Sequence, residues 1–109
     1  MTFEEYQQLS RETAVYPEVG KNFIYPTLGL AGEAGEVAEK IKKVLRDDGG
    51  IVNAEKKEEL LKELGDVLWY LSQIATELKL SLDAVASFNI HKLMSRKERG
   101  KISGSGDNR

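Results

Sequence analysis

Apolar side chains recur every three or four positions in four stretches of the chain, a spacing typical of helices that bury one face. The first stretch begins at Phe3, directly after Thr2. Thr2 and Glu5, three residues later, form a capping-box sequence. The four stretches cover residues 3–14, 27–46, 53–78 and 82–99. Because no segment alternates apolar and polar residues as a strand would, the pattern predicts an all-α fold of four helices.

Turn-forming residues separate the four predicted helices. Residues 15–26 contain both prolines, a glycine and three aromatic side chains, and this composition predicts a loop able to line a pocket. The Asp-Asp-Gly-Gly sequence after the second stretch ends that helix, and Ser81 is a suitable N-cap for the fourth. The final ten residues contain three glycines and two serines without apolar periodicity. We therefore predict one domain at residues 1–99 and a flexible Gly/Ser-rich tail at residues 100–109.

The composition narrows the classes of protein to which the chain can belong. Two long helices in a chain of this kind would leave much apolar surface exposed, which predicts a homodimer or a higher oligomer. The chain has no cysteine and therefore no disulfide, thiolate nucleophile or zinc–cysteine site. It shows neither a signal-peptide pattern nor a stretch of about 20 apolar residues able to span a bilayer. We expect a cytoplasmic protein with no membrane partner.

Charge is distributed unevenly along the chain. Sixteen Lys and Arg against eighteen Asp and Glu give a formal net charge of −2, the wrong sign for a general nucleic-acid-binding protein. No nucleic-acid partner is therefore expected. Residues 91–109 nevertheless carry six basic and two acidic side chains, so an anionic ligand is expected to approach this segment.

Two pairs of carboxylates are the first candidate for chemistry. Glu33 and Glu36 lie three residues apart in the second predicted helix, and Glu63 and Asp66 have the same spacing in the third. Residues at this spacing share a helix face, so four carboxylates converge if the two helices lie side by side. Such a cluster is favourable around a cation, and Mg²⁺ or Mn²⁺ prefers oxygen ligands of this kind. The alternative is a set of ordinary surface carboxylates, which are common on solvated helix faces.

Glycines lie beside both carboxylate pairs. Gly29, Gly32 and Gly35 recur every third residue in the second helix, and Gly65 lies within the second pair. A glycine inside a helix costs about 1 kcal/mol relative to alanine, so a compensating contact is expected. Close approach of a ligand and packing of another helix are the two contacts that would supply it.

The last predicted helix carries the second candidate for chemistry. Lys92, Arg96 and Arg99 share a helical face at steps of four and three residues, with Asn89 nearby. Guanidinium and ammonium groups in this arrangement can hold a polyphosphate, and the Asn89 amide can bond to a sugar or base. The alternative is a solvated helix end whose cations favour the C-terminal dipole.

The two carboxylate-bearing helices resemble the signature helices of the MazG-like nucleoside triphosphate pyrophosphohydrolases. The resemblance rests on GLAGEAGEVAEKIKK at residues 29–43 and ELGDVLWYLSQIA at residues 63–75, which carry Glu-x-x-Glu and Glu-x-x-Asp in the family's order. Residues 89–109 are also similar to the closing segment of many short bacterial and phage members. The resemblance spans most of the chain, from about residue 28 to its last residue.

This resemblance implies a four-helix MazG-like bundle, completed by oligomerisation, that hydrolyses a nucleoside triphosphate between its α and β phosphates. The implied magnesium ligands are Glu33, Glu36, Glu63 and Asp66, and Glu33 or Glu36 is implied to activate the attacking water. The implied substrate contacts on the last helix are Asn89, Lys92 and Arg96, and Arg99 lies on the same face. Residues 100–109 would then close over the phosphates as an active-site lid, in the same or a neighbouring subunit.

The sequence leaves the base and sugar preference open. A hydrolase selective for one deoxynucleotide, such as dCTP, dUTP or dGTP, would have the same metal ligands, and its selectivity would rest on loops such as residues 15–26. A helical interaction protein without catalytic activity is the alternative of another class, and it predicts no effect of magnesium. An antitoxin-like or DNA-associated protein is disfavoured by the pI of about 5.5.

Overall fold

The structure, a computed structural model, describes residues 1–109, and all of its regular secondary structure is helical. Four helices follow one another along the chain: α1 (Phe3–Arg11), α2 (Ile24–Asp47), α3 (Ala54–Glu77) and α4 (Leu82–Glu98). The prediction of an all-α fold with four helices is therefore confirmed. The boundaries of α3 and α4 lie within one residue of those predicted, whereas α1 ends early and α2 begins early.

Helix α1 begins as the capping box predicts. The Thr2 hydroxyl accepts a hydrogen bond from the Glu5 N–H at 3.1 Å, and the Glu5 carboxylate accepts one from the Thr2 N–H at 3.3 Å. The apolar pattern predicts a helix to residue 14, but α1 ends at Arg11. The reason is that the amides of residues 12–14 bond to carbonyls three residues back, the tighter turn that often ends an α-helix.

Helix α2 begins at Ile24, three residues before its predicted start. Pro26, which is expected from the sequence to precede the helix, lies inside its first turn. A proline is tolerated there, since the first amides of a helix have no partner within the helix. The N–H of Ile24 is instead bonded to Asn22 Oδ1 at 3.0 Å. The Asp-Asp-Gly-Gly sequence ends the helix as predicted, and its two glycines have φ values of 62° and 79°, which favour glycine.

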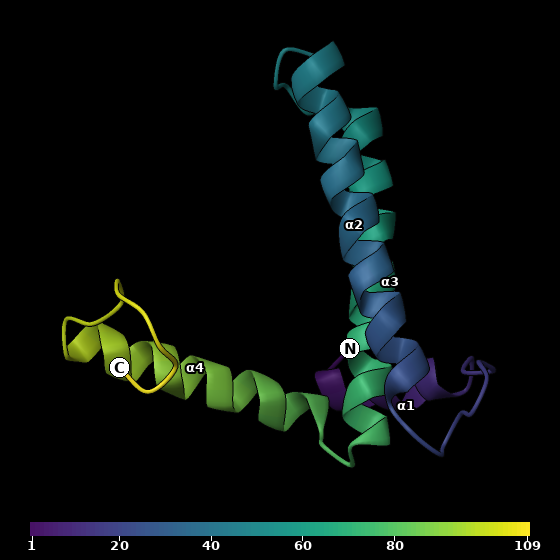
Figure 1. The fold of residues 1–109 in the computed structure, drawn as a ribbon, viewed down its shortest axis with the longest axis vertical. Coiled ribbons are helices and arrows are strands. Elements are labelled where there is room, and N and C mark those ends of the chain that lie inside the picture. The colour runs from purple at the N-terminus through teal and green to yellow at the C-terminus, as the bar shows by residue number, and fades with distance from the viewer.

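Helices α2 and α3 form a long antiparallel hairpin, and α1 packs beside the C-terminal end of α3 (Figure 1). Helix α4 leaves that end and projects away from the hairpin, in contact with α1 and α3 but not with α2 (Figure 1). The radius of gyration is 16.7 Å. A compact chain of this length would have about 13 Å, so α4 is an arm rather than the fourth member of a closed bundle within one chain.

Gln7 fixes the corner between α3 and α4. Its amide nitrogen donates to Thr76 Oγ1 and to the Leu80 carbonyl, both at 3.0 Å, and its amide oxygen accepts from the Leu82 N–H at 2.7 Å. Ser81 caps the N-terminus of α4 as predicted. One side chain of α1 thereby sets the direction in which α4 leaves the hairpin.

Little of the chain is buried. The buried hydrophobic side chains are Tyr16, Val44, Ala75 and Leu82. Large apolar side chains remain exposed on the other elements, including Leu61 on α3 at 70% and Phe88 on α4 at 79%. None of the four helices combines the length and apolar character that a membrane crossing requires. Exposed apolar surface on this scale is typical of a face that another protein covers.

Candidate active site

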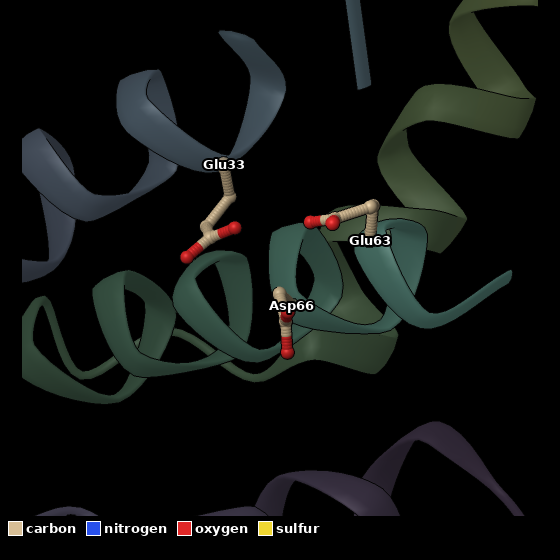
Figure 2. Close-up of side chains that lie close together, drawn as sticks. All are labelled: Glu33, Glu63 and Asp66. Atoms are coloured by element: carbon tan, nitrogen blue, oxygen red, sulfur yellow. The ribbon is translucent and has the colours of Figure 1, made fainter. Parts of the chain in front are cut away.

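Three of the four predicted metal ligands converge between α2 and α3. Glu33 projects from α2 toward Glu63 and Asp66 on α3, and each residue offers a carboxylate oxygen within 4.8 Å of the others (Figure 2). The antiparallel pairing of the helices brings these faces together. Glu36 lies outside this trio, exposed and three residues further along α2. The structure thus brings both carboxylates of the α3 pair into the trio, but only one carboxylate of the α2 pair.

The carboxylates of the trio repel one another. Partial burial raises the pKa of the Glu33 carboxyl, and the negative charges of Asp66, Glu63 and Glu36 raise it further. Glu36 therefore belongs to the electrostatic surroundings of the trio although it does not converge with it. A hard divalent cation would remove this repulsion, because it prefers several oxygen ligands in close proximity. The donor set, made only of carboxylate oxygens, fits Mg²⁺ or Mn²⁺.

Lys40 is a cation beside the trio that the sequence reasoning did not single out. Its Nζ lies 3.7 Å from Glu63 Oε1 and 3.7 Å from Glu59 Oε2, so it links α2 to the acidic face of α3. The spacing carried a signal, because Lys40 follows Glu36 by four residues and Glu33 by seven and so shares their face. Lys40 balances part of the negative charge at the Glu63 end of the trio.

The glycines of α2 and α3 differ in what surrounds them. A Cβ at Gly29 would lie 2.2 Å from Tyr70 Cε1, whereas nothing lies within 4 Å of a Cβ at Gly32, Gly35 or Gly65. Gly29 therefore has the expected compensating contact, in the form of helix packing against an aromatic ring. At the other three glycines the chain itself provides no close contact.

An aromatic cluster lies beside the carboxylates and extends to the loop between α1 and α2. Its four rings belong to Tyr16, Tyr25, Trp69 and Tyr70. Successive rings are stacked or edge-on, with centroids 5.1 to 6.2 Å apart. Tyr70 lies one helical turn after Asp66, and burial raises the pKa of its hydroxyl, as do Tyr25 and the charges of Glu33 and Asp66. The loop thus contributes the Tyr16 ring to an aromatic cluster whose Tyr70 lies one helical turn from Asp66.

Glu77 ties this loop to α3. Its carboxylate, only 2% exposed, accepts hydrogen bonds from Arg11 Nη1 and Nη2 at 3.1 Å, from the Gly20 N–H at 2.9 Å and from the Tyr16 hydroxyl. Burial alone would raise the pKa of Glu77, but the bonds from Tyr16, Gly20 and Arg11 outweigh burial and hold it below its ordinary value. Glu77 therefore fixes Tyr16 in the aromatic cluster.

The four predicted substrate contacts on α4 lie away from the trio of the same chain. They are Asn89, Lys92, Arg96 and Arg99. Helix α4 does not contact α2, and the half that carries these residues is the part that projects furthest from the hairpin (Figure 1). One chain therefore does not bring the two sets of predicted site residues together.

Residues 100–109, predicted as a tail or lid, fold back along α4 (Figure 1). Lys92 Nζ lies 3.3 Å from Asp107 Oδ1, and Arg96 Nη2 donates to the Asp107 carbonyl at 2.6 Å. Arg99 Nη2 donates to the Arg109 backbone oxygen at 2.8 Å. The tail thus contacts all three cations predicted to bind phosphate, while a role as a lid over substrate stays a prediction.

Comparison with known proteins identifies the family of the chain. Residues 26–100, which include both carboxylate pairs, match the MazG nucleotide pyrophosphohydrolase domain. The chain is also 47% identical over 114 aligned residues to the Gene 37 protein of Mycobacterium phage L5, and the alignment covers the whole of both chains. No solved structure matches. Because the domain match covers more than half of an all-α chain, the chain belongs to the MazG nucleotide pyrophosphohydrolase family.

Proposed function

We propose that the chain is a Mg²⁺-dependent nucleoside triphosphate pyrophosphohydrolase, which converts a ribo- or deoxyribonucleoside triphosphate and water into the monophosphate and pyrophosphate. The observation that carries this proposal is the convergence of Glu33, Glu63 and Asp66 within 4.8 Å in a member of this family. Control of nucleotide pools and removal of damaged nucleotides would both use this reaction.

Glu33, Glu63 and Asp66 would hold the magnesium, and Glu36 would join them from the next turn of α2. A magnesium ion bound there would neutralise phosphate charge and orient the phosphates for in-line attack. Mn²⁺ is expected to substitute, because it accepts the same oxygen ligands. Lys40 would keep its ion pair with Glu59 when Glu63 turns toward the cation.

The reaction forms a bond between a water oxygen and the α phosphorus, and it breaks the bond from that phosphorus to the oxygen bridging the α and β phosphates. Pyrophosphate leaves, and the proton of the water passes to a carboxylate. Glu36 suits this role because it is exposed, lies three residues from Glu33 and takes part in no ion pair. Glu33, which projects into the same site from α2, is the second candidate.

We further propose that a homodimer or homotetramer completes the site. Arg96 lies about 21 Å along α4 from its start, and Asp66 lies about 16 Å along α3 from its end, so one chain keeps them apart. A second copy that placed its α4 beside the hairpin would cover exposed apolar side chains such as Leu61 and Phe88. The same contact would bring the α4 substrate residues to the phosphates: Asn89, Lys92, Arg96 and Arg99.

Selectivity for one deoxynucleotide, such as dCTP, dUTP or dGTP, is the second candidate function, and the aromatic cluster favours it. A base that stacks on an aromatic ring gains about 1–3 kcal/mol. Tyr70 lies one turn from Asp66, so a nucleoside whose phosphates are held at the trio would present its base near the cluster. Tyr16 from the loop and Tyr25 from the first turn of α2 would then distinguish one base from another.

Pyrophosphate release from a panel of ribo-, deoxyribo- and modified nucleoside triphosphates tests both candidates. Turnover is expected with Mg²⁺, to be lost in EDTA, and to fall by at least about 100-fold in Glu36→Gln, Glu63→Gln and Asp66→Asn. Glu58→Gln is the matched control, because Glu58 is an exposed carboxylate of α3 outside the trio. Absence of turnover for every nucleotide would instead support a helical interaction protein without catalytic activity.

A further inference from the structure

Four oxygen atoms of the tail face the cations of α4, and three of them lie in Asp107 and Arg109. Asp107 Oδ1 lies 3.3 Å from Lys92 Nζ and 3.6 Å from Arg96 Nη2. The Asp107 carbonyl accepts from Arg96 Nη2 at 2.6 Å, and the Arg109 backbone oxygen accepts from Arg99 Nη2 at 2.8 Å. A polyphosphate would present oxygen acceptors to the same donors. A polyphosphate bound at these three side chains would therefore have to replace the tail oxygens.

Arg96 is covered by the tail without being fully satisfied by it. Arg96 is only 5% exposed, although it is charged and lies on the projecting helix α4. The carbonyls of Gly106 and Asp107 accept from Nη2, at 3.4 and 2.6 Å, but the buried Nε has no partner. A buried donor without an acceptor is unfavourable. A phosphate group could accept from Nε and Nη2 together, which the tail does not do.

The tail holds its reversed shape through its own residues. The Arg109 guanidinium donates to three tail carbonyls at 2.7 to 3.2 Å, those of Lys101, Ile102 and Gly106. Gly104 and Gly106 have φ values of 128° and 87°, a region that other residues rarely adopt. The turn that places Asp107 beside α4 therefore depends on Gly104, Gly106 and Arg109.

We propose that residues 101–109 act as an internal competitor, whose Asp107 carboxylate and backbone carbonyls occupy the cationic face of α4 formed by Lys92, Arg96 and Arg99 until a polyphosphate displaces them. This proposal rests on the proposed function, because it concerns the side chains proposed there to hold the substrate phosphates. It differs from a lid, since a lid closes over bound phosphates whereas this tail must leave before they bind.

The contacts are weak enough for such an exchange. The Asp107 side chain is 86% exposed, and ion pairs between exposed groups contribute little. A triphosphate carries several negative charges, whereas Asp107 is the only acidic side chain of the tail. When the binding-competent state is only partly populated, the apparent Kd rises in inverse proportion to that population, so we expect the tail to weaken polyphosphate binding about three- to tenfold.

Calorimetric titration of the full chain with inorganic pyrophosphate, in EDTA, tests the proposal without requiring turnover. Asp107→Asn is expected to bind pyrophosphate about three- to tenfold more tightly than the natural sequence. Glu98→Gln removes one negative charge from the same end of α4 but contacts no tail residue, so its affinity is expected to change less than about twofold. Equal affinities for the two variants would overturn the proposal.

The Arg109→Gln variant distinguishes competition by the tail from general electrostatics, because the two predict opposite changes in the affinity for pyrophosphate. Loss of a positive charge weakens anion binding if general electrostatics dominate, whereas loss of the tail's internal bonds strengthens it if the tail competes. We expect tighter binding, together with changes in the NMR chemical shifts of residues 101–109 toward those of an unstructured segment when pyrophosphate is added to the natural sequence. Weaker binding by Arg109→Gln, or tail chemical shifts that stay unchanged in saturating pyrophosphate, would overturn the tail proposal even if nucleotides are hydrolysed. Absence of hydrolysis would overturn the enzyme proposal alone.

Discussion

The ring of Tyr70 lies against the backbone of Gly29, where a Cβ would fall 2.2 Å from Tyr70 Cε1. Gly29 precedes Glu33 by four residues in α2, and Tyr70 follows Asp66 by four residues in α3. This close contact between the two helices therefore lies one turn from the carboxylates that they bring together. Any change in this contact is expected to alter the spacing of the carboxylates of Glu33, Glu63 and Asp66.

Gly29→Ala is expected to destabilise the protein by about 1–3 kcal/mol, because the added methyl group forces α2 and the Tyr70 ring apart. Gly32→Ala is the matched control, and it is expected to stabilise by up to about 1 kcal/mol because nothing lies within 4 Å of its Cβ. Urea unfolding measures both. In a Tyr70→Ala background the cost of Gly29→Ala should largely disappear, and a cost that persists there would exclude the ring as its cause.

Glu33→Gln is expected to have opposite effects on stability without and with magnesium. The raised pKa of Glu33 means that its charged form is disfavoured in the folded chain, so stability falls as pH rises through that pKa. Removing one of three like charges should stabilise the protein in EDTA by about 0.5 kcal/mol, or about 2–4 °C in Tm. The increase in Tm on adding Mg²⁺ should be lost in the same variant. Glu58→Gln should change neither value, and a lower Tm for Glu33→Gln in EDTA would contradict mutual repulsion.

Glu77→Gln is expected to lower the free energy of unfolding by about 2–3 kcal/mol at neutral pH, because Arg11 loses its buried partner. The lowered pKa of Glu77 means that this stabilisation is present above the ordinary pKa of about 4.3 and is lost as pH falls through the folded value. The difference between the two proteins should therefore shrink in acid. Trp69, the single tryptophan, reports unfolding by fluorescence beside Tyr16.

Glu18→Gln provides the control for Glu77, because Glu18 forms an exposed ion pair with Lys21. Exposed pairs contribute little, so this variant should unfold like the natural sequence at every pH. A pH-independent difference between Glu77→Gln and the natural sequence would show that the carboxylate charge is not what stabilises the loop.

Lys40→Gln is expected to tighten Mg²⁺ binding about two- to fivefold, because Glu63 loses the ammonium group 3.7 Å away that competes with the cation. Lys42→Gln removes the same charge from an exposed residue of α2 that pairs with Glu39, and it should have a smaller effect. Calorimetric titration with Mg²⁺ measures both affinities. Weaker binding by Lys40→Gln would mean that Lys40 positions Glu63 rather than competing for it.

The four helices of this protein could be predicted from the sequence because the features that start and end them are local. The capping box at Thr2, the N-cap at Ser81 and the glycines after α2 act through hydrogen bonds and backbone angles within a few residues. Spacing of three residues likewise determines that Glu63 and Asp66 share a face of α3. Pro26 is the exception, because the local sequence predicts a loop there, whereas α2 accepts the proline in its first turn.

Only the tertiary structure decided which of the predicted site residues meet. The pairing of α2 with α3 brings Glu33 to the carboxylates of α3 and leaves Glu36 outside the trio, because the register of two helices depends on packing contacts such as that of Gly29 with Tyr70. The direction of α4 likewise depends on Gln7, whose partners lie more than 60 residues away in the chain. Local periodicity specifies a helix and its faces, but contacts between distant residues specify where that helix points, and these determine which charges share a site.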